Sequence, residues 1–342
     1  MTDPASVGSV ERVKGSLFGL AFGDALGRPT EFLTVEEIIK RYGQAGPREL
    51  EGDPALVTDD TQMALGVAWA LYEAPEFTPA VVERLLRRRF VAWAHSPDNN
   101  RAPGNTCMRA VAGLDEGLRW QLASVPGSKG CGANMRVTPV GLLPGIDDDM
   151  LANLAQLQAG LTHGHPTALA ASELTAYAVR VLVRGEAGLA DLPELLRDRA
   201  RQQRTIFRAD WLGDLWLRPG ATTPEDYIAR GWDDCLGVLG RLDAALPAAD
   251  RDTDPCLQTG AGWIAEEALA TALLCALLYA DDPVAGLARA ATTSGDSDSI
   301  ACLAGAMLGA AHGIDAWPDK WAARIEYADQ LAALSRAFSA HR

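Results

Sequence analysis

Two short segments, residues 57–63 and 294–300, place carboxylates and hydroxyls together immediately before apolar runs. The side chains concerned are Thr58, Asp59, Asp60, Asp296, Asp298 and Ser299. Either segment alone is compatible with an ordinary helix N-cap, because the oxygens of Ser, Thr and Asp accept the free N–H groups of a first helical turn. A cap needs only one short polar side chain, however, and each segment supplies two carboxylates. This surplus of anionic oxygen indicates a bound cation.

The types of side chain in these segments indicate which cation would bind. Carboxylate and hydroxyl oxygens are hard ligands that suit Mg²⁺ or Mn²⁺, whereas a zinc site is expected to contain His or Cys. If the two segments face each other in the fold, they can hold two ions roughly 3.5–4 Å apart, which orient hydroxyls and activate a water. The sequence therefore predicts a two-ion magnesium site.

A glycine-rich segment and a histidine are further candidates for ligand binding. Residues 127–132 contain three glycines together with Ser128 and Lys129, and such a loop can turn backbone N–H groups toward a phosphate. A plain surface turn has the same composition, and the segment matches neither the Walker sequence nor the dinucleotide fingerprint. His163 lies shortly before Pro166, which is typical of a first helical turn. A loop histidine that satisfies a helix end is the structural alternative.

Several strings that follow one another along the chain resemble the motifs of the ADP-ribosylglycohydrolase family. They are residues 15–27, 29–32, 58–61, 102–106, 127–136, 161–163 and 295–299. Any one of these strings is weakly informative, but their order is specific, and together they span roughly residues 12–313. The resemblance implies an all-α, orthogonally packed helical domain that binds two Mg²⁺ ions and hydrolyses the bond between ADP-ribose and an acceptor.

The resemblance also implies roles for individual side chains. The implied metal ligands are Thr58, Asp59, Asp60, Asp296, Asp298 and Ser299, the last of which is commonly Thr in the family. The implied substrate contacts are Gly127, Ser128, Gly130 and Gly132 at the diphosphate, His163 at the distal ribose, and Asn105. Glu31 is implied as the carboxylate that assists the water or the leaving group, on a loop that Gly27 and Pro29 allow to move as a flap. An exposed surface acid is its alternative.

Two positions depart from the pattern of some relatives. Lys129 stands where those relatives have an aromatic residue that stacks on adenine, so the resemblance gives no adenine contact here. Ala102 stands where some relatives have an acidic residue, so position 102 cannot supply a base. A structural role is expected for Trp263, Glu266 and Glu267, which resemble a helix motif of the family, and no role is assigned to His165.

The segments that would position these side chains are helical. Apolar residues recur at helical spacing in residues 61–72, 81–94, 150–161, 167–183, 264–279 and 300–313, and strand-like alternation is scarce. Glycines at every fourth position from 15 to 27 each cost helix stability but allow a second helix to approach closely. We predict an all-α protein with a single domain over residues 1–342, a core at about 12–313, a C-terminal helical extension at 314–342, and a peripheral segment at 185–254.

The composition restricts the classes of partner. The formal net charge of −14 disfavours broad electrostatic binding to nucleic acid or to anionic membranes. Six cysteines without a CxxC pair predict neither a zinc site nor a disulfide framework. Without an evident signal peptide or a bilayer-length apolar run, we expect a cytoplasmic protein, with a monomer as the default state.

The sequence leaves the acceptor open. Arginine, serine, a nucleic-acid base or terminal phosphate, and O-acetyl-ADP-ribose are all compatible with these motifs, so the expected partner is an ADP-ribosylated protein or another ADP-ribosylated acceptor. Two other functions also stay open: a non-catalytic ADP-ribose-binding or structural relative, and a two-metal phosphoesterase acting on nucleotides. The reaction products distinguish a phosphoesterase from an ADP-ribosylhydrolase, because a phosphoesterase releases AMP rather than intact ADP-ribose.

Overall fold

The computed structural model describes residues 4–248 and 250–340, and in these ranges it contains helices and isolated β-bridges but no strand. The α-helices are α1 (Pro4–Gly27), α2 (Val35–Tyr42), α3 (Asp59–Glu73), α4 (Pro79–Ala94), α5 (Asn105–Asp115), α6 (Trp120–Ala123), α7 (Thr138–Gly141), α8 (Asp148–Gly160), α9 (Pro166–Arg184), α10 (Leu192–Gln203), α11 (Ala209–Leu212), α12 (Pro224–Ala245), α13 (Cys256–Thr259), α14 (Ala265–Leu278), α15 (Pro283–Ala290), α16 (Ser297–His312), α17 (Asp319–Arg324) and α18 (Ala328–Ser339). Short 3₁₀ helices lie at Cys131–Ala133, Leu189–Asp191, Leu215–Leu217, Leu246–Ala248 and Ile314–Ala316. The predicted all-α class is confirmed.

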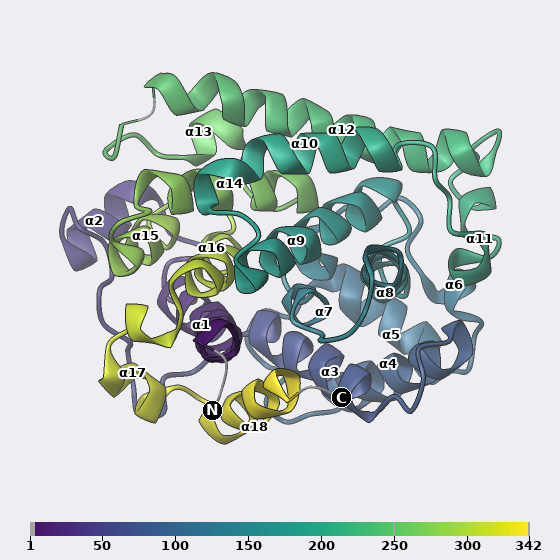
Figure 1. Ribbon diagram of the computed structural model, residues 1–342, viewed down its shortest axis with the longest axis horizontal. Helices are drawn as coiled ribbons and strands as arrows, with labels where there is room; N and C mark the ends of the chain where they lie inside the picture. The colour runs from purple at the N-terminus through teal and green to yellow at the C-terminus, as the bar shows by residue number, and fades with distance from the viewer. Residues whose placement is uncertain (1–3, 249, 341–342) are drawn as a thin grey trace.

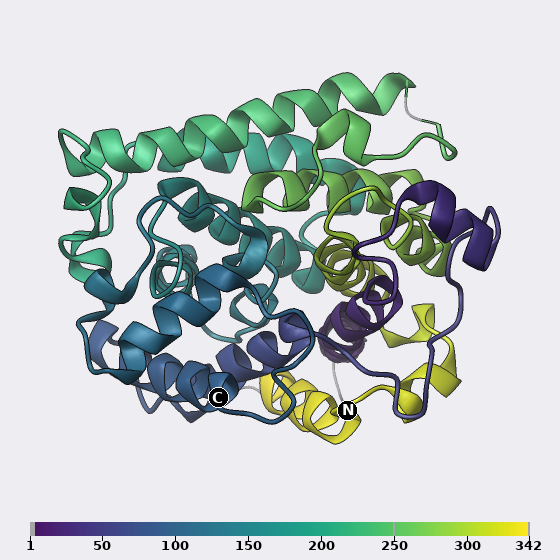
Figure 2. The same cartoon turned by 180° about the vertical axis from the view of Figure 1, so that it is seen from behind.

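The helices arrange around a buried centre (Figure 1). Helix α9 is buried along nearly its whole length and packs against α8, α12, α14 and α16. Helix α12, from the segment expected at the periphery, runs along one edge of the molecule in both views (Figures 1 and 2). Helix α18, from the predicted C-terminal extension, packs against α1 and α3. The six cysteines are buried and free of disulfides, and no helix in the described ranges is long and apolar enough to span a bilayer.

Helices α1 and α16 form the closest helix pair, and the glycines of α1 make it possible. A Cβ at Gly19 would lie 2.3 Å from the carbonyl oxygen of Gly305, and one at Gly23 would lie 2.0 Å from that of Ala301. Residue numbers rise along α1 as those of its contacts fall along α16, so the helices are antiparallel. The C-terminal end of α1 therefore meets the N-terminal end of α16, where Gly27 lies against Asp298.

This packing reverses the usual effect of a helical glycine substitution. Gly→Ala in an exposed helix stabilises by roughly 1 kcal/mol, and we expect that result for Gly237→Ala in α12, where a Cβ meets nothing within 4 Å. Gly23→Ala is expected to destabilise by roughly 2 kcal/mol or more, because backbone atoms of α16 cannot move aside as a side chain would. Urea unfolding of both variants measures the difference, and stabilisation by both would contradict the close approach.

Candidate metal centre and substrate pocket

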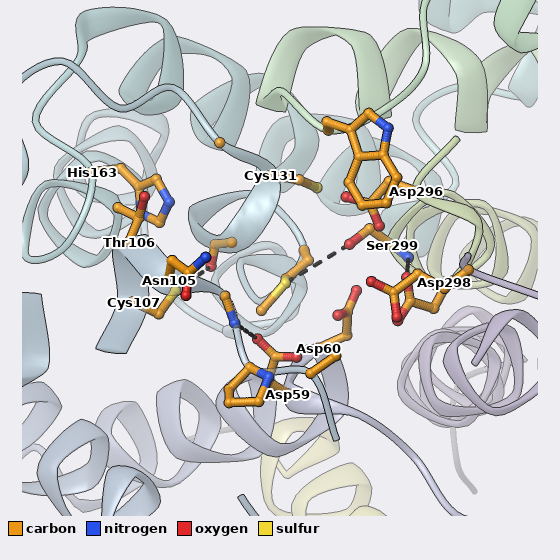
Figure 3. Close-up of a pocket in the computed structure, with 18 of the residues that line it drawn as sticks. Asp59, Asp60, Asn105, Thr106, Cys107, Cys131, His163, Asp296, Asp298 and Ser299 are labelled. Atoms are coloured by element: carbon orange, nitrogen blue, oxygen red, sulfur yellow. Dashed lines mark hydrogen bonds between the residues drawn. The ribbon is translucent and has the colours of Figure 1, made fainter. Parts of the chain in front are cut away.

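Six carboxylates gather where α1, α3 and α16 meet. Asp24 lies in the last turn of α1 and Glu31 on the loop that follows. Two further pairs lie at the N-terminal ends of α3 and α16: Asp59, Asp60, Asp296 and Asp298. One potential ligand oxygen from each of Glu31, Asp296 and Asp298 lies within 4.8 Å of the other two. Figure 3 shows Asp60, Asp296 and Asp298 on one side of a pocket, opposite Asn105 and His163. The two acidic segments thus face each other, as the two-ion interpretation requires.

The pocket has a volume of about 480 Å³. Its lining includes all the predicted site residues except Thr58, Gly127 and Ser128, namely Glu31, Asp59, Asp60, Asn105, Gly130, Gly132, His163, Asp296, Asp298 and Ser299. The other lining residues are Phe32, Ala102, Pro103, Gly104, Thr106, Cys107, Cys131, Met135 and Trp263. The fold therefore brings most of the candidate side chains into one cavity of a size suited to a small-molecule ligand.

The N-terminal end of α3 is organised by Asp24, a residue to which the sequence assigned no role. The buried Asp24 carboxylate accepts hydrogen bonds from the Thr58 amide (2.9 Å) and hydroxyl (2.9 Å), and from the Thr61 amide (3.0 Å) and hydroxyl (2.5 Å). Thr58 is the N-cap of α3, and its hydroxyl lies 3.2 Å from Oδ2 of Asp60. Asp24 thus fixes the turn that carries Asp59 and Asp60.

The carboxylates of the two acidic turns contribute little to helix capping. In α16 the Asp296 side chain makes no cap hydrogen bond, and Asp298 accepts from the adjacent Ser299 amide at 2.9 Å. In α3 the Oδ1 atom of Asp60 is buried without a hydrogen-bond partner, while Asp59 accepts from the Gly104 amide at 3.1 Å. Capping alone therefore does not account for the anionic oxygens at these two helix starts.

Burial and mutual repulsion disfavour the charged form of these acids. Burial, followed by the charge of Asp298, raises the pKa of Asp24 to about 7. The same two causes raise the pKa of Glu31 to about 9, and burial raises that of Asp59 to about 7. Burial also raises the pKa values of the remaining three, Asp60, Asp296 and Asp298. Among the neighbouring groups that shift these six pKa values most, there is no Lys or Arg. A set of hard oxygen ligands without a basic partner fits a divalent cation.

The glycine loop faces the pocket with its second half. Gly130 and Gly132 line the cavity, and a Cβ at Gly132 would lie 2.8 Å from Cys107 Sγ and 3.2 Å from His163 Cε1, so only glycine fits there. Hydrogen bonds hold this half to the start of α14: the Cys131 amide donates to the Trp263 carbonyl at 3.0 Å. Gly127, by contrast, lines a separate cavity beside His165.

Two residues of the loop segment, Ser128 and Lys129, do not line the pocket and are held by side-chain contacts. The Ser128 hydroxyl lies 2.9 Å from that of Thr106, which itself lines the pocket. The Lys129 ammonium donates to Asp234 at 3.0 Å and also to Glu266. Lys129 is therefore paired with acids of α12 and α14, and it does not replace the missing aromatic residue within the cavity.

His163 is buried beside Gly130 and Gly132, and its environment keeps it neutral. Burial, with the charge of the buried Arg136, lowers the pKa of His163 to about 3. Arg136 donates to the Thr162 hydroxyl at 2.8 Å, and that hydroxyl lies 2.8 Å from His163 Nδ1. The Thr162 hydroxyl has one proton and two nearby acceptors, His163 Nδ1 at 2.8 Å and the Ala159 carbonyl at 3.4 Å. The shorter contact favours donation to Nδ1 and hence the tautomer with its proton on Nε2. The imidazole can then donate a hydrogen bond to a ligand in the pocket.

Two aromatic side chains lie at the rim of the pocket, where the sequence did not indicate them. Trp263, for which a structural role was expected, is 46% exposed and stacks on Phe32, which is 70% exposed, with ring centroids 6.2 Å apart. The Trp263 side chain therefore lies at the pocket rim, and the structural role expected for it stays a prediction. Glu267 makes a contact of the expected structural kind, because it accepts from the Ala261 amide at 3.1 Å. His165 is the N-cap of α9 and accepts from the Thr167 amide.

The fold is an all-helical domain with an acidic pocket where α1, α3 and α16 meet. A solved structure described as an ADP-ribosylglycohydrolase-related protein complex superposes with a TM-score of 0.65 and 24% identity, covering 97% of this chain and 98% of that one. The sequence model of the ADP-ribosylglycohydrolase family matches residues 5–342, and the chain belongs to this family. The family supports a hydrolase that acts on ADP-ribose linkages.

Several curated relatives carry functional names, among them two bacterial hydrolases. The ADP-ribosyl-[dinitrogen reductase] glycohydrolase of Rhodospirillum rubrum is 27% identical over 92% of this chain and 90% of its own length. The ADP-ribosylarginine hydrolase Tri1 of Pseudomonas putida is 25% identical over 96% of this chain and 78% of its own length. The chain thus resembles these hydrolases along nearly its whole length, and the similarity is not limited to one motif.

Proposed function

We propose that this protein is a Mg²⁺-dependent ADP-ribosylhydrolase that cleaves the N- or O-glycosidic bond between the distal ribose of ADP-ribose and an acceptor. The observation that carries the proposal is the group of buried carboxylates at one side of the pocket, none of them principally influenced by a basic side chain. A ligand with two phosphates would be repelled by this group unless cations neutralised it. The family match independently supports ADP-ribose as that ligand.

The residues that would hold two Mg²⁺ ions, or Mn²⁺ ions, are Thr58, Asp59, Asp60, Asp296, Asp298 and Ser299. When bound, such ions orient vicinal hydroxyls and lower the pKa of a coordinated water. Thr58 does not line the cavity, but a hydroxyl oxygen that donates its proton to Asp24 keeps lone pairs free for coordination. Asp24 would not bind the metal itself but would fix the turn that carries Thr58, Asp59 and Asp60.

The chain's own side chains would bind the sugar and move the proton. His163, neutral and protonated on Nε2, would donate to the distal ribose, and Asn105 at the start of α5 would contact the substrate from the same side. The amides of the loop at Gly130 and Gly132 would contact the diphosphate. Glu31 would take a proton from the attacking water or give one to the leaving group, since bond cleavage passes through a transition state resembling an oxocarbenium ion.

The test is single-turnover release of ADP-ribose from an ADP-ribosylated acceptor, with Mg²⁺ and with EDTA. The name of the Tri1 relative makes ADP-ribosylarginine the first acceptor to assay, followed by serine-linked, nucleic-acid-linked and O-acetyl forms. We expect release in Mg²⁺ at a rate at least roughly 10³ times that in EDTA. Equal rates under both conditions would refute the metal-dependent mechanism.

The same samples distinguish the other two functions. Calorimetric binding of ADP-ribose without turnover of any acceptor would identify a silent binder. Appearance of AMP in place of intact ADP-ribose would identify a phosphoesterase. Residues of the two acidic turns line the same pocket as Glu31. This arrangement supports the hydrolase over the silent binder and over the phosphoesterase.

A further inference from the structure

The short segment from Arg324, the last residue of α17, to Tyr327, the N-cap of α18, contacts the chain just before two stretches that line the pocket, at residues 59–60 and 102–107. Oε2 of Glu326 accepts a hydrogen bond from the Val57 amide at 3.1 Å. Nη1 of Arg101 donates to the Val57 carbonyl at 2.5 Å and to Glu326 Oε2 at 2.6 Å, and its Nη2 donates to Glu326 Oε1 at 3.0 Å. The two side chains are 15% and 13% exposed. Both backbone polar groups of Val57 are therefore bound by one bidentate ion pair.

The positions joined by this pair are adjacent to pocket residues. Val57 directly precedes Thr58, and Arg101 directly precedes Ala102, which lines the pocket. Ala102 has a φ of 51°, a left-handed conformation that an alanine adopts only where its surroundings impose it. Two residues further on, the Gly104 amide donates to Asp59. The pair thus connects the acidic turn of α3 to the loop that forms the facing wall.

The neighbouring residues of the C-terminal segment strengthen the same connection. The Ala55 amide donates to the Arg324 carbonyl at 2.7 Å, and the Glu326 amide donates to the Ala55 carbonyl at 2.9 Å. The Tyr327 hydroxyl donates to Asp98 at 2.9 Å, and Tyr327 has a left-handed φ of 59°. Two non-glycine residues with positive φ, Ala102 and Tyr327, therefore lie at the two ends of one network, next to a partly buried ion pair.

We propose that Glu326 and Arg101 are positioning residues, which hold residues 57 and 102 at a fixed separation and thereby set the positions of Thr58, Asp59 and Asp60. Neither side chain lines the pocket, so they act through the backbone. Ligand groups bind and react well only when they are held within about 0.5 Å of the productive geometry. The functional part of this inference rests on the proposed function, whereas the positioning itself is a property of the protein without metal or substrate.

The experiment compares Glu326→Gln with Glu49→Gln in the full chain. Glu49 pairs with Lys320 and also joins the irregular segment before α3 to the C-terminal region, but both partners are well exposed. In metal-free protein we expect Glu326→Gln to speed hydrogen exchange of the Thr58 and Thr61 amides, which donate to Asp24, by roughly tenfold, as a local opening. Amides in the middle of α9 and α16 are expected to keep their rates. Glu49→Gln is expected to leave all of these rates unchanged.

Two further measurements separate positioning from general stabilisation. Calorimetric titration with Mn²⁺ is expected to give a dissociation constant roughly tenfold weaker in Glu326→Gln, with a fall in kcat that excess Mn²⁺ partly restores. Arg101→Lys, which keeps the charge but loses the bidentate geometry, is expected to show the same local exchange. Unchanged exchange at Thr58 and Thr61, or a uniform increase in exchange over the whole chain, would overturn the proposal. If the wild type releases no ADP-ribose, the proposed function fails, and the exchange data still decide the positioning.

Discussion

Replacing Asp60 by Asn is expected to weaken Mg²⁺ binding and to lower kcat/KM for ADP-ribose release by roughly 10³-fold. Oδ1 of Asp60 is buried without a partner, and Asp298, Asp24, Asp59 and Asp296 surround the group. Asn has the same shape and removes only one negative charge, so the fold around Thr58 is retained while a ligand is lost. Calorimetric titration with Mg²⁺ and initial rates under saturating Mg²⁺ measure the two effects.

The same substitution is expected to stabilise the metal-free protein. Burial and the neighbouring carboxylates raise the pKa of Asp60 in the folded state, so the charged form near pH 7.5 costs folding free energy that the unfolded chain does not incur. Asn removes this cost, and the free energy of unfolding in EDTA is expected to rise by roughly 1–3 kcal/mol. Urea unfolding in EDTA measures it. An acid with a purely structural role would instead lower stability when replaced.

Asp226→Asn is the matched control. Helix α12 also begins at a threonine N-cap, Thr223, and carries Asp226 in its first turn, but Asp226 is exposed. We expect this substitution to change neither Mg²⁺ affinity nor turnover, and to alter stability by no more than roughly 0.5 kcal/mol. Wild-type Mg²⁺ affinity in Asp60→Asn would exclude Asp60 as a ligand.

Local patterns were sufficient to predict several of the long helices, among them α3, α9 and α16, and the acidic turns. Helical spacing located α3 and α16, and the doubled carboxylates before each run indicated that capping was an incomplete explanation. The glycine spacing from Gly15 to Gly27 predicted a close helix partner without identifying it. That partner is α16, and the antiparallel pairing is what brings the end of α1 to Asp298. One sequence pattern thus contributes both to the fold and to the assembly of the site.

The residues that the sequence missed act through partners distant in the chain. Asp24 is a single acid within a helix, and its importance appears only when Thr58 and Thr61 are known to donate to it. Glu326 lies outside the segment that resembles family motifs, and its contact with Val57 spans 269 positions. Such roles depend on tertiary contacts, for which spacing within a single sequence carries no signal.

The glycine loop shows the opposite difficulty, because composition alone cannot determine which way a residue faces. Gly127, Gly130 and Gly132 are the same type of residue within one short segment, yet only the last two line the pocket, and Ser128 does not. The difference arises from the attachment of the second half of the loop to Trp263 and the start of α14. The diphosphate contacts of all four therefore remain predictions, with Gly130 and Gly132 the ones that the geometry supports.

Glu31→Gln is expected to lower kcat by roughly 10²–10³-fold while changing the dissociation constant of ADP-ribose by less than about threefold. Glu31 lies on the loop after α1, lines the pocket, and is half-buried beside Asp296 and Asp298. A glutamine keeps the size and hydrogen-bonding capacity of the side chain but cannot exchange a proton. Single-turnover rates measure the loss, and calorimetry with ADP-ribose in Mg²⁺ measures the retained binding.

The proximity of Glu31 to Asp296 and Asp298 gives it a second possible role, as a metal ligand, and the Mg²⁺ affinity of the variant decides between the two. If Glu31 only transfers a proton, Glu31→Gln is expected to keep a Mg²⁺ affinity close to that of the wild type. If Glu31 is a metal ligand, the substitution is expected to weaken Mg²⁺ binding, as Asp60→Asn does. Glu36→Gln, at an exposed acid in the first turn of α2, is expected to preserve rate and affinity alike. Wild-type turnover in Glu31→Gln would remove Glu31 from both roles, and the proton transfer would then belong to another group in the pocket.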